Sequence, residues 1–416
     1  MEREVKRPGF PRVIGASWLV PWLILVTAAG CLGQQASSRA SQRQSALAFE
    51  NEGNIVEAEA AWRSLIRSQP TDSEAYAHLG LLEARQEHYK DAIDLDRKAL
   101  RLNPAMPHLR LNLGLALFKA GDLRGAIQAF EPLLKREPKT SPEALRLVTL
   151  IGLAHYGLGD YAAAVPYLKQ ADAADPQNLE FRMDLAQSCL RTKQYQCVLE
   201  TYHEILTINP NSAEADMLMG EAYDEMKEEG NAMEQYQAAI KADPTIPNAH
   251  FGYGYMLWRL SQFSQAEEEF KAELAITPDH AFALAYLGDS ELQLNHPDQA
   301  KLNLARAIQL EPSIALAHLD MGILYQNQGR KEEALRELKA AEKLEPNDQQ
   351  VHWDLGRLYQ SMGQEAEAKV EFEKTRKVLD RRIQSTQEKL QRLTAASKGG
   401  AHAPQPAGQS AGVPPK

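Results

Sequence analysis

The residues of this chain that could carry out chemistry do not form a recognisable catalytic motif. The sequence has no G-x-x-x-x-G-K phosphate loop, no G-x-S-x-G nucleophile elbow and no H-E-x-x-H metal motif. A G-x-G occurs at Gly252 and Gly254, but the register derived below places both inside one helix, not between a strand and a helix. We therefore predict that the protein is not an enzyme, has no catalytic residues and uses no cofactor.

The composition predicts an ordinary soluble helical protein. Of 416 residues, 44% are hydrophobic and 25% are charged, and alanine, leucine, glutamate, glutamine and lysine are abundant. The net charge of −10 argues against a nucleic-acid partner, because no basic surface is available to replace the counterions of phosphate groups.

The first thirty residues differ from the rest. Four basic residues precede an almost wholly apolar stretch at 13–30, and Cys31 follows. We predict a signal segment at 1–30 and a polar linker at 31–38. The residues Ala28-Ala29-Gly30-Cys31 resemble a bacterial lipobox, which implies lipidation of Cys31. Cleavage without lipidation and an uncleaved membrane anchor are the alternatives. Each places the remainder in the periplasm or tethered at the cell envelope, with membrane association only through this segment.

A repeat of about 34 residues organises the rest of the chain. Prolines recur at this spacing, and the one longer gap, between Pro138 and Pro176, contains four extra residues near 141–144. The recurring prolines are Pro70, Pro104, Pro138, Pro176, Pro210, Pro244, Pro278, Pro312 and Pro346. With each proline numbered as position 32 of its repeat, position 8 is glycine or alanine and position 20 is alanine or valine in all ten registers.

Small residues at these two positions predict close helix packing. A glycine inside a helix costs about 1 kcal/mol relative to alanine, so its recurrence implies a backbone approach that a side chain would block. We expect the alanine at position 20 to supply the other half of that contact, in a second, antiparallel helix. A large residue at position 24, such as Trp62 or Phe270, should fill the space towards neighbouring repeats. The proline ends the second helix.

This pattern, with an aromatic at position 11 (Tyr223, Tyr325, Tyr359), resembles the tetratricopeptide repeat. The resemblance covers 39–382 and implies an all-α, right-handed solenoid of about ten helix-turn-helix repeats. It also implies that the first helices line a concave groove. Beyond the repeats we predict a capping helix extension at 383–396, with a coiled-coil contact as the alternative, and a disordered tail at 397–416.

Three histidines share position 4 of their repeats, namely His250, His318 and His352. Adjacent helices pack about 8–10 Å apart, so equivalent positions cannot share an ion held at about 2 Å. We predict that they are packing residues, and that the chain has no metal site.

The resemblance implies a partner-binding groove. Carried onto this sequence, its groove positions place the following residues along the first helices: Phe251, Tyr255, Trp258, Phe282, Tyr286, Glu221 and Asp224. Aromatic side chains give a large contact area at little entropic cost, which favours a protein or peptide partner. The alternatives are that several aromatics pack between repeats and that the carboxylates form a solvated face.

Two cysteines remain besides Cys31. Cys189 and Cys197 lie at positions 11 and 19 of repeat 5, which come roughly level in an antiparallel helix pair. In an oxidising compartment this predicts a disulfide, and two buried thiols are the alternative.

Together these features predict a non-enzymatic scaffold or adaptor of the bacterial cell envelope that binds polypeptide segments in its concave groove. Two other functions stay open: a periplasmic, chaperone-like holder of extended chains, and a regulatory subunit of a separate envelope enzyme.

Overall fold

The computed structural model describes residues 40–399, with side chains to residue 392. The predicted signal segment with Cys31, the linker at 31–38 and the tail from residue 400 onwards lie outside the described residues. Among residues 40–399, no helix combines the length and apolar composition that crossing a membrane requires.

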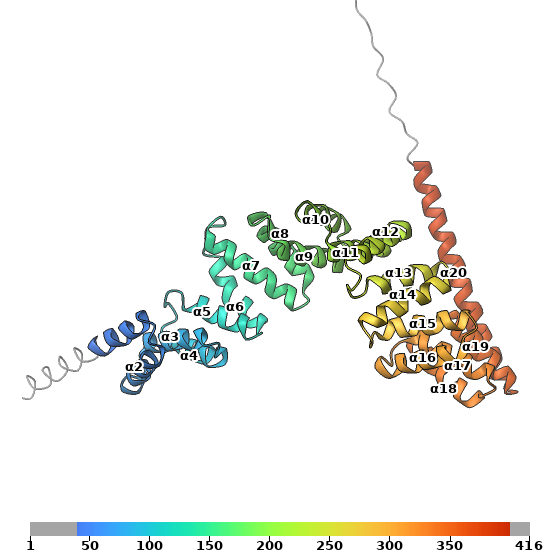
Figure 1. The fold of residues 1–416 in the computed structure, drawn as a ribbon, viewed down its shortest axis with the longest axis horizontal. Coiled ribbons are helices and arrows are strands. Elements are labelled where there is room, and N and C mark those ends of the chain that lie inside the picture. Colours follow the sequence, from blue (N-terminus) through green and yellow to red (C-terminus); the bar gives the residue numbers. More distant parts are fainter. Residues whose placement is uncertain (1–39, 400–416) are drawn as a thin grey trace, which may run out of the picture. The chain divides into compact units, whose positions relative to one another are not determined.

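The described residues form helices and no strands, which confirms the all-α prediction (Figure 1). They divide into two compact units between Gln194 and Tyr195. The first unit contains a helix over 40–51 followed by α2 (Ile55–Ser68), α3 (Ser73–Arg85), α4 (Tyr89–Leu102), α5 (Leu109–Lys119), α6 (Leu123–Leu134), α7 (Pro142–Gly157), α8 (Tyr161–Ala174) and α9 (Leu179–Arg191). The second contains α10 (Tyr195–Ile208), α11 (Ala213–Met226), α12 (Glu229–Ala242), α13 (Ala249–Arg259), α14 (Phe263–Ile276), α15 (Ala281–Gln293), α16 (Pro297–Leu310), α17 (Ala315–Asn327), α18 (Lys331–Leu344), α19 (Gln349–Ser361) and α20 (Glu365–Gly399).

Within each unit, consecutive helices form the predicted pairs. From α3 onwards, odd-numbered helices are the first helices of the repeats and even-numbered helices are the second. Within each unit, neighbouring first helices also contact one another, as α13 contacts α15 and α17 contacts α19. In the second unit the first helices from α11 to α19 therefore form a continuous layer in which side chains from adjacent repeats can meet.

The four extra residues at 141–144 lengthen α7 at its beginning. This helix has 16 residues, and Ser141 precedes it as the N-cap, accepting a hydrogen bond at Oγ from the backbone N–H of Ala144 at 3.0 Å. Pro142 occupies the first turn, where a missing N–H costs nothing. The insertion is therefore absorbed by one extra helical turn.

The glycine at position 8 faces chiefly the residue at position 24 of the same repeat. A Cβ added at Gly114 would lie 2.4 Å from the ring of Phe130, and one added at Gly254 would lie 3.0 Å from the ring of Phe270. Both phenylalanine side chains are fully buried. The predicted glycine–alanine contact is present in repeats 2 and 8, where an added Cβ at Gly80 or Gly288 would lie 3.4 or 3.3 Å from the backbone oxygen of Ala92 or Ala300. The side chain at position 24 lies closer still, because it reaches back across its own helix pair.

One aromatic ring packs against two glycines, one from its own repeat and one from the next repeat. The Tyr236 side chain on α12 lies against both Gly220 on α11 and Gly252 on α13, and added Cβ atoms would approach it to 2.8 and 2.5 Å. Tyr236 is buried, so its ring has little room to move. Gly252 thereby fixes how closely repeat 7 packs on repeat 6.

We expect Gly252→Ala to destabilise the second unit by about 1–3 kcal/mol, the usual cost of overpacking a filled core. The matched control is Gly230→Ala on α12, where nothing lies within 4 Å of the added Cβ. The Gly230→Ala control should raise the free energy of unfolding by up to about 1 kcal/mol, because alanine favours the helix more than glycine does. Urea unfolding followed by far-UV circular dichroism measures both, and equal effects at the two glycines would contradict the packing argument.

The last helix is longer than the others. α20 has 35 residues and contains the predicted extension at 383–396 and the first residues of the predicted tail. Two apolar residues of α20, Leu379 and Ile383, are 40% and 48% exposed.

Candidate functional site

Four of the five predicted groove aromatics form one cluster in the second unit. Phe251, Tyr255 and Trp258 share one face of α13 because they are spaced by four and three residues, and Tyr286 reaches them from α15. The Tyr286 ring centroid lies 6.1 Å from that of Phe251, 5.2 Å from that of Tyr255 and 4.9 Å from that of Trp258. These four residues, called the aromatic cluster below, are all partly buried.

The fifth predicted aromatic behaves differently. Phe282 lies one helical turn before Tyr286 on α15, and its side chain is 49% exposed. An exposed aromatic ring offers a large apolar area that a partner could bury. Phe282 therefore offers accessible apolar surface beside a cluster that is already packed.

Buried groups hold the aromatic cluster in place. The fully buried Phe270 ring of α14 lies 6.0 Å from Phe251 and 6.1 Å from Tyr286. The Trp258 indole N–H donates a hydrogen bond to Asp289 Oδ2 on α15. The rings are thus positioned by the protein itself.

A row of buried carboxyl groups begins at that hydrogen bond. Asp289, Asp320 and Asp354 lie on the successive first helices α15, α17 and α19, and burial raises the pKa of each. The charges of Asp289 and Asp354 add to this effect at Asp320. Within residues 40–399, Asp320 Oδ2 has no hydrogen-bond partner. The row gives an acidic character to the interior next to the aromatic cluster.

The two predicted groove carboxylates are not equivalent. Asp224 accepts a hydrogen bond from Arg259 at 2.7 Å, so its charge is already paired with a residue of the next repeat. Glu221 is half-buried on α11. Burial of the Tyr236 hydroxyl raises its pKa, and the charges of Glu221 and Asp224 raise it further. Asp224 therefore serves the packing of α11 on α13.

The sequence analysis missed a cavity in the first unit. Its volume is about 620 Å³, and its lining includes Arg43, His78 and Asn112. Arg43 forms ion pairs with Asp72 at 2.6 Å and with Glu74 at 2.8 Å. Arg43 lies at position 5 of its repeat, and His78 and Asn112 lie at position 6 of theirs. The family resemblance places both positions in the groove, so the repeat register could have indicated these residues.

The three position-4 histidines each pair with a glutamate of the second helix in the same repeat. The Nδ1–Oε2 distances are 2.6 Å for His250–Glu269, 2.7 Å for His318–Glu337 and 2.8 Å for His352–Glu371. The hydrogen bond to Glu337 raises the pKa of His318 despite its burial. These histidines are polar links between paired helices, which the expectation of packing residues did not include.

The two cysteines of repeat 5 lie at the division between the units. Cys189 is on α9 and Cys197 is on α10, with 0% and 7% exposed area. Their pairing stays a prediction.

Comparison with known proteins identifies the repeat. Three family models, each described as a tetratricopeptide repeat, match the chain. The first matches 44–107, 111–178, 230–281 and 319–369, more than half of the chain, and the others match 155–222 and 213–246. No curated protein sequence matches.

Several solved structures are similar to parts of the chain. PilF of Pseudomonas aeruginosa is 18% identical over 46% of this chain and 87% of its own, with a TM-score of 0.42. A tetratricopeptide repeat protein of Parabacteroides merdae is 18% identical over 60% and 97%, with a TM-score of 0.46. YrrB, described as a tetratricopeptide repeat protein with an unusual peptide-binding site, is 19% identical over 45% and 97%, with a TM-score of 0.37. On the family-model matches and the helix-pair architecture, the chain belongs to the tetratricopeptide repeat family.

Proposed function

We propose that this protein is a non-enzymatic interaction scaffold that binds a polypeptide segment across α13 and α15. The observation that carries the proposal is the aromatic cluster together with the exposed ring of Phe282. Aromatic side chains dominate the binding energy of many protein interfaces, because they bury a large area and lose little conformational freedom.

Rigidity supports this assignment. Phe270 lies beneath the aromatic cluster, and Asp289 fixes the Trp258 indole, so a partner would meet rings that are already ordered. Binding to an ordered surface avoids much of the entropic cost of immobilising side chains. Two neighbouring repeats span roughly 20 Å, since adjacent helices are about 8–10 Å apart. About six residues of extended chain, at roughly 3.3 Å each, match that length.

The location of the scaffold is part of the proposal. The basic and apolar residues at 1–30 and Cys31 favour export, with the repeats in the periplasm or tethered at the envelope. In that setting the chain would gather components of an envelope assembly. A holder of many extended chains and a regulatory subunit of a separate enzyme are the competing functions.

A photo-crosslinking amino acid at Phe282 tests the proposal in cells. Phe282 suits the probe because it is exposed and outside the aromatic cluster, and Glu268 on α14 is the matched exposed control. We expect one discrete adduct from position 282 and none from position 268. Adducts in the membrane fraction would support lipidation or an anchor, and adducts in the soluble fraction would support cleavage.

Other outcomes separate the alternatives. Many heterogeneous adducts from position 282 would favour the holder of extended chains, and a single adduct with an enzyme would favour the regulatory subunit. Equal labelling from both positions, or none from either, would show that the surface around α13 and α15 is not the binding site.

A further inference from the structure

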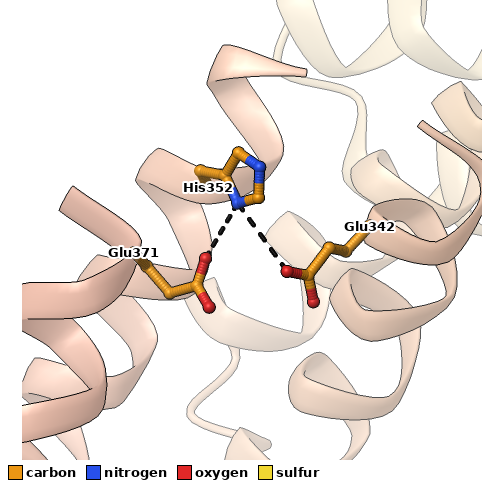
Figure 2. A group of neighbouring side chains, drawn as sticks. All are labelled: Glu342, His352 and Glu371. Atoms are coloured by element: carbon orange, nitrogen blue, oxygen red, sulfur yellow. Dashed lines mark hydrogen bonds and ion pairs between the residues drawn. The ribbon is translucent and has the colours of Figure 1, made fainter. Parts of the chain in front are cut away.

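A histidine and two glutamates meet where repeats 9 and 10 join. Glu342 comes from the end of α18, His352 from α19 and Glu371 from α20, and one ligand atom of each lies within 4.8 Å of the others (Figure 2). His352 Nδ1 is 2.8 Å from Glu371 Oε2 and 3.9 Å from Glu342 Oε1. His352 and Glu371 are buried, so these two groups are held in place by their surroundings.

Both ring nitrogens of His352 face hydrogen-bond acceptors, although a neutral imidazole can donate from only one of them. Nε2 is 2.9 Å from the backbone oxygen of Pro346, while Nδ1 faces the two carboxylates. All of these oxygens are acceptors, and a neutral imidazole has a single N–H to donate. When Nε2–H donates to Pro346, the Nδ1 lone pair points at carboxylate oxygens. A second proton on the ring or a metal ion between Nδ1 and the carboxylates resolves the conflict.

We propose that Glu342, His352 and Glu371 bind a divalent transition-metal ion of the zinc class, with a fourth position left for water. Zinc binds nitrogen and carboxylate oxygen at about 2.0–2.2 Å, which places tetrahedral ligands about 3.3–3.5 Å apart. The two distances from Nδ1, 2.8 and 3.9 Å, lie on either side of that value, and all three ligand atoms lie within 4.8 Å of one another, so the side chains must shift to close around an ion. One imidazole and two carboxylates suit zinc better than magnesium, which prefers oxygen ligands alone. The Pro346 carbonyl is the kind of outer partner that orients metal-binding histidines.

The ammonium groups of two lysines lie against the carboxylates of this cluster, where a metal ion would bind. Lys374 Nζ is 2.7 Å from Glu342 Oε1, which is the oxygen that faces His352, and 3.0 Å from Glu371 Oε1. Lys339 Nζ is 2.8 Å from the other oxygen of Glu342. Both lysine side chains are about 40% exposed, so Lys374 can withdraw into water when a metal takes its place. Metal binding then replaces the Lys374 ammonium group beside the two carboxylates, so Lys374 competes with the metal ion for them.

Other repeats carry the same histidine–glutamate pair without the third carboxylate. His318–Glu337 and His250–Glu269 have equivalent geometry, but the residues in the register of Glu342 are Ile308 and Ile240. His318 also faces a proline oxygen, that of Pro312 at 3.2 Å. Glu342 is therefore the residue that distinguishes a metal site from a polar link between helices, and the His318–Glu337 pair provides a control within the same chain.

Zinc titration of the untagged, chelator-treated full-length protein tests the proposal. Isothermal calorimetry should give one high-affinity zinc per chain, and Co²⁺ should give the visible absorption of a four-coordinate ion. Glu342→Gln should weaken zinc binding by more than the roughly 10- to 100-fold that loss of an outer partner costs. Glu337→Gln should leave it unchanged, and Lys374→Gln should tighten it.

Circular dichroism identifies any variant that has lost its fold. Tighter binding by Lys374→Gln cannot come from unfolding, so this variant keeps the test decisive if another is unstable. The proposal is overturned if the wild-type chain takes up no zinc, or if Glu342→Gln and Glu337→Gln bind zinc equally well. The cluster is then a network in which Lys339 and Lys374 neutralise the two glutamates.

Discussion

Replacing Asp96 with leucine is expected to stabilise the first unit by about 6 kcal/mol at pH 8 and by only about 2 kcal/mol at pH 4. Asp96 is 1% exposed on α4, and within the described part of the chain its Oδ1 has no hydrogen-bond partner. Burial raises the pKa of this carboxyl group from 3.8 to about 7. The fold therefore contains an acid where an apolar side chain belongs.

The repeat register shows which side chain fits this site. Leu304 and Leu338 occupy the same position in repeats 8 and 9, where added Cβ atoms at Gly288 and Gly322 would lie 2.6 Å from them. In repeat 2, Asp96 Oδ1 lies 2.5 Å from the Cβ position of Gly80. Leucine at 96 should therefore pack as it does elsewhere in the chain, adding about 1.5–3 kcal/mol from apolar burial at any pH.

The pH dependence follows from the direction of the shift. The folded pKa of Asp96 lies above its unfolded value, so folding is penalised once the unfolded chain has ionised and the folded chain has not. The penalty is absent below about pH 4, grows as the pH rises and reaches about 4 kcal/mol above pH 7, at roughly 1.4 kcal/mol per pKa unit. Leucine has no such penalty, so its advantage grows with pH.

Hydrogen exchange of the amides in α3 and α4, followed by mass spectrometry at pH 4 and pH 8, reads the local stability of this repeat in the intact chain. Asp94→Leu is the matched control, because Asp94 is exposed on the same helix. The control should change stability by no more than about 0.5 kcal/mol. An equal gain for Asp96→Leu at both pH values would show that the native Asp96 carries no ionisation penalty.

The second large effect is expected from Phe270→Ala, which should destabilise the second unit by about 3–5 kcal/mol. The Phe270 ring is fully buried between the backbone of Gly254 and the rings of Phe251 and Tyr286. Its loss leaves a cavity beneath the aromatic cluster, because the helices around it can close only in part. Urea unfolding measures the loss, and partner crosslinking should fall with it.

Phe282→Ala is the contrasting variant, because Phe282 is 49% exposed on the neighbouring helix α15. We expect a stability change of about 0.5 kcal/mol or less, as for most surface substitutions. Binding of the crosslinked partner should nevertheless weaken. If Phe282→Ala destabilised the second unit as much as Phe270→Ala, Phe282 would be a packing residue and the proposed contact surface would lose its exposed member.

The local features of this protein could be predicted from its sequence. Evenly spaced prolines and the small residues at position 8 define the helix pairs, because they act on backbone close by in the chain. The one longer gap between prolines, from Pro138 to Pro176, located the four extra residues, and the structure shows that they lengthen α7. The resemblance to the repeat family placed Phe251, Tyr255 and Trp258 along one first helix, and the structure puts them on one face of α13.

The partners of those side chains were decided only by the tertiary structure. Asp224 is paired with Arg259, 35 residues away, and His352 meets glutamates from two other helices. The cavity beside Arg43 likewise draws on three repeats. Periodicity tells which face of a helix a residue occupies, but a contact depends on the side chains that converge there from neighbouring helices. Their lengths and charges vary from repeat to repeat while the backbone pattern stays the same.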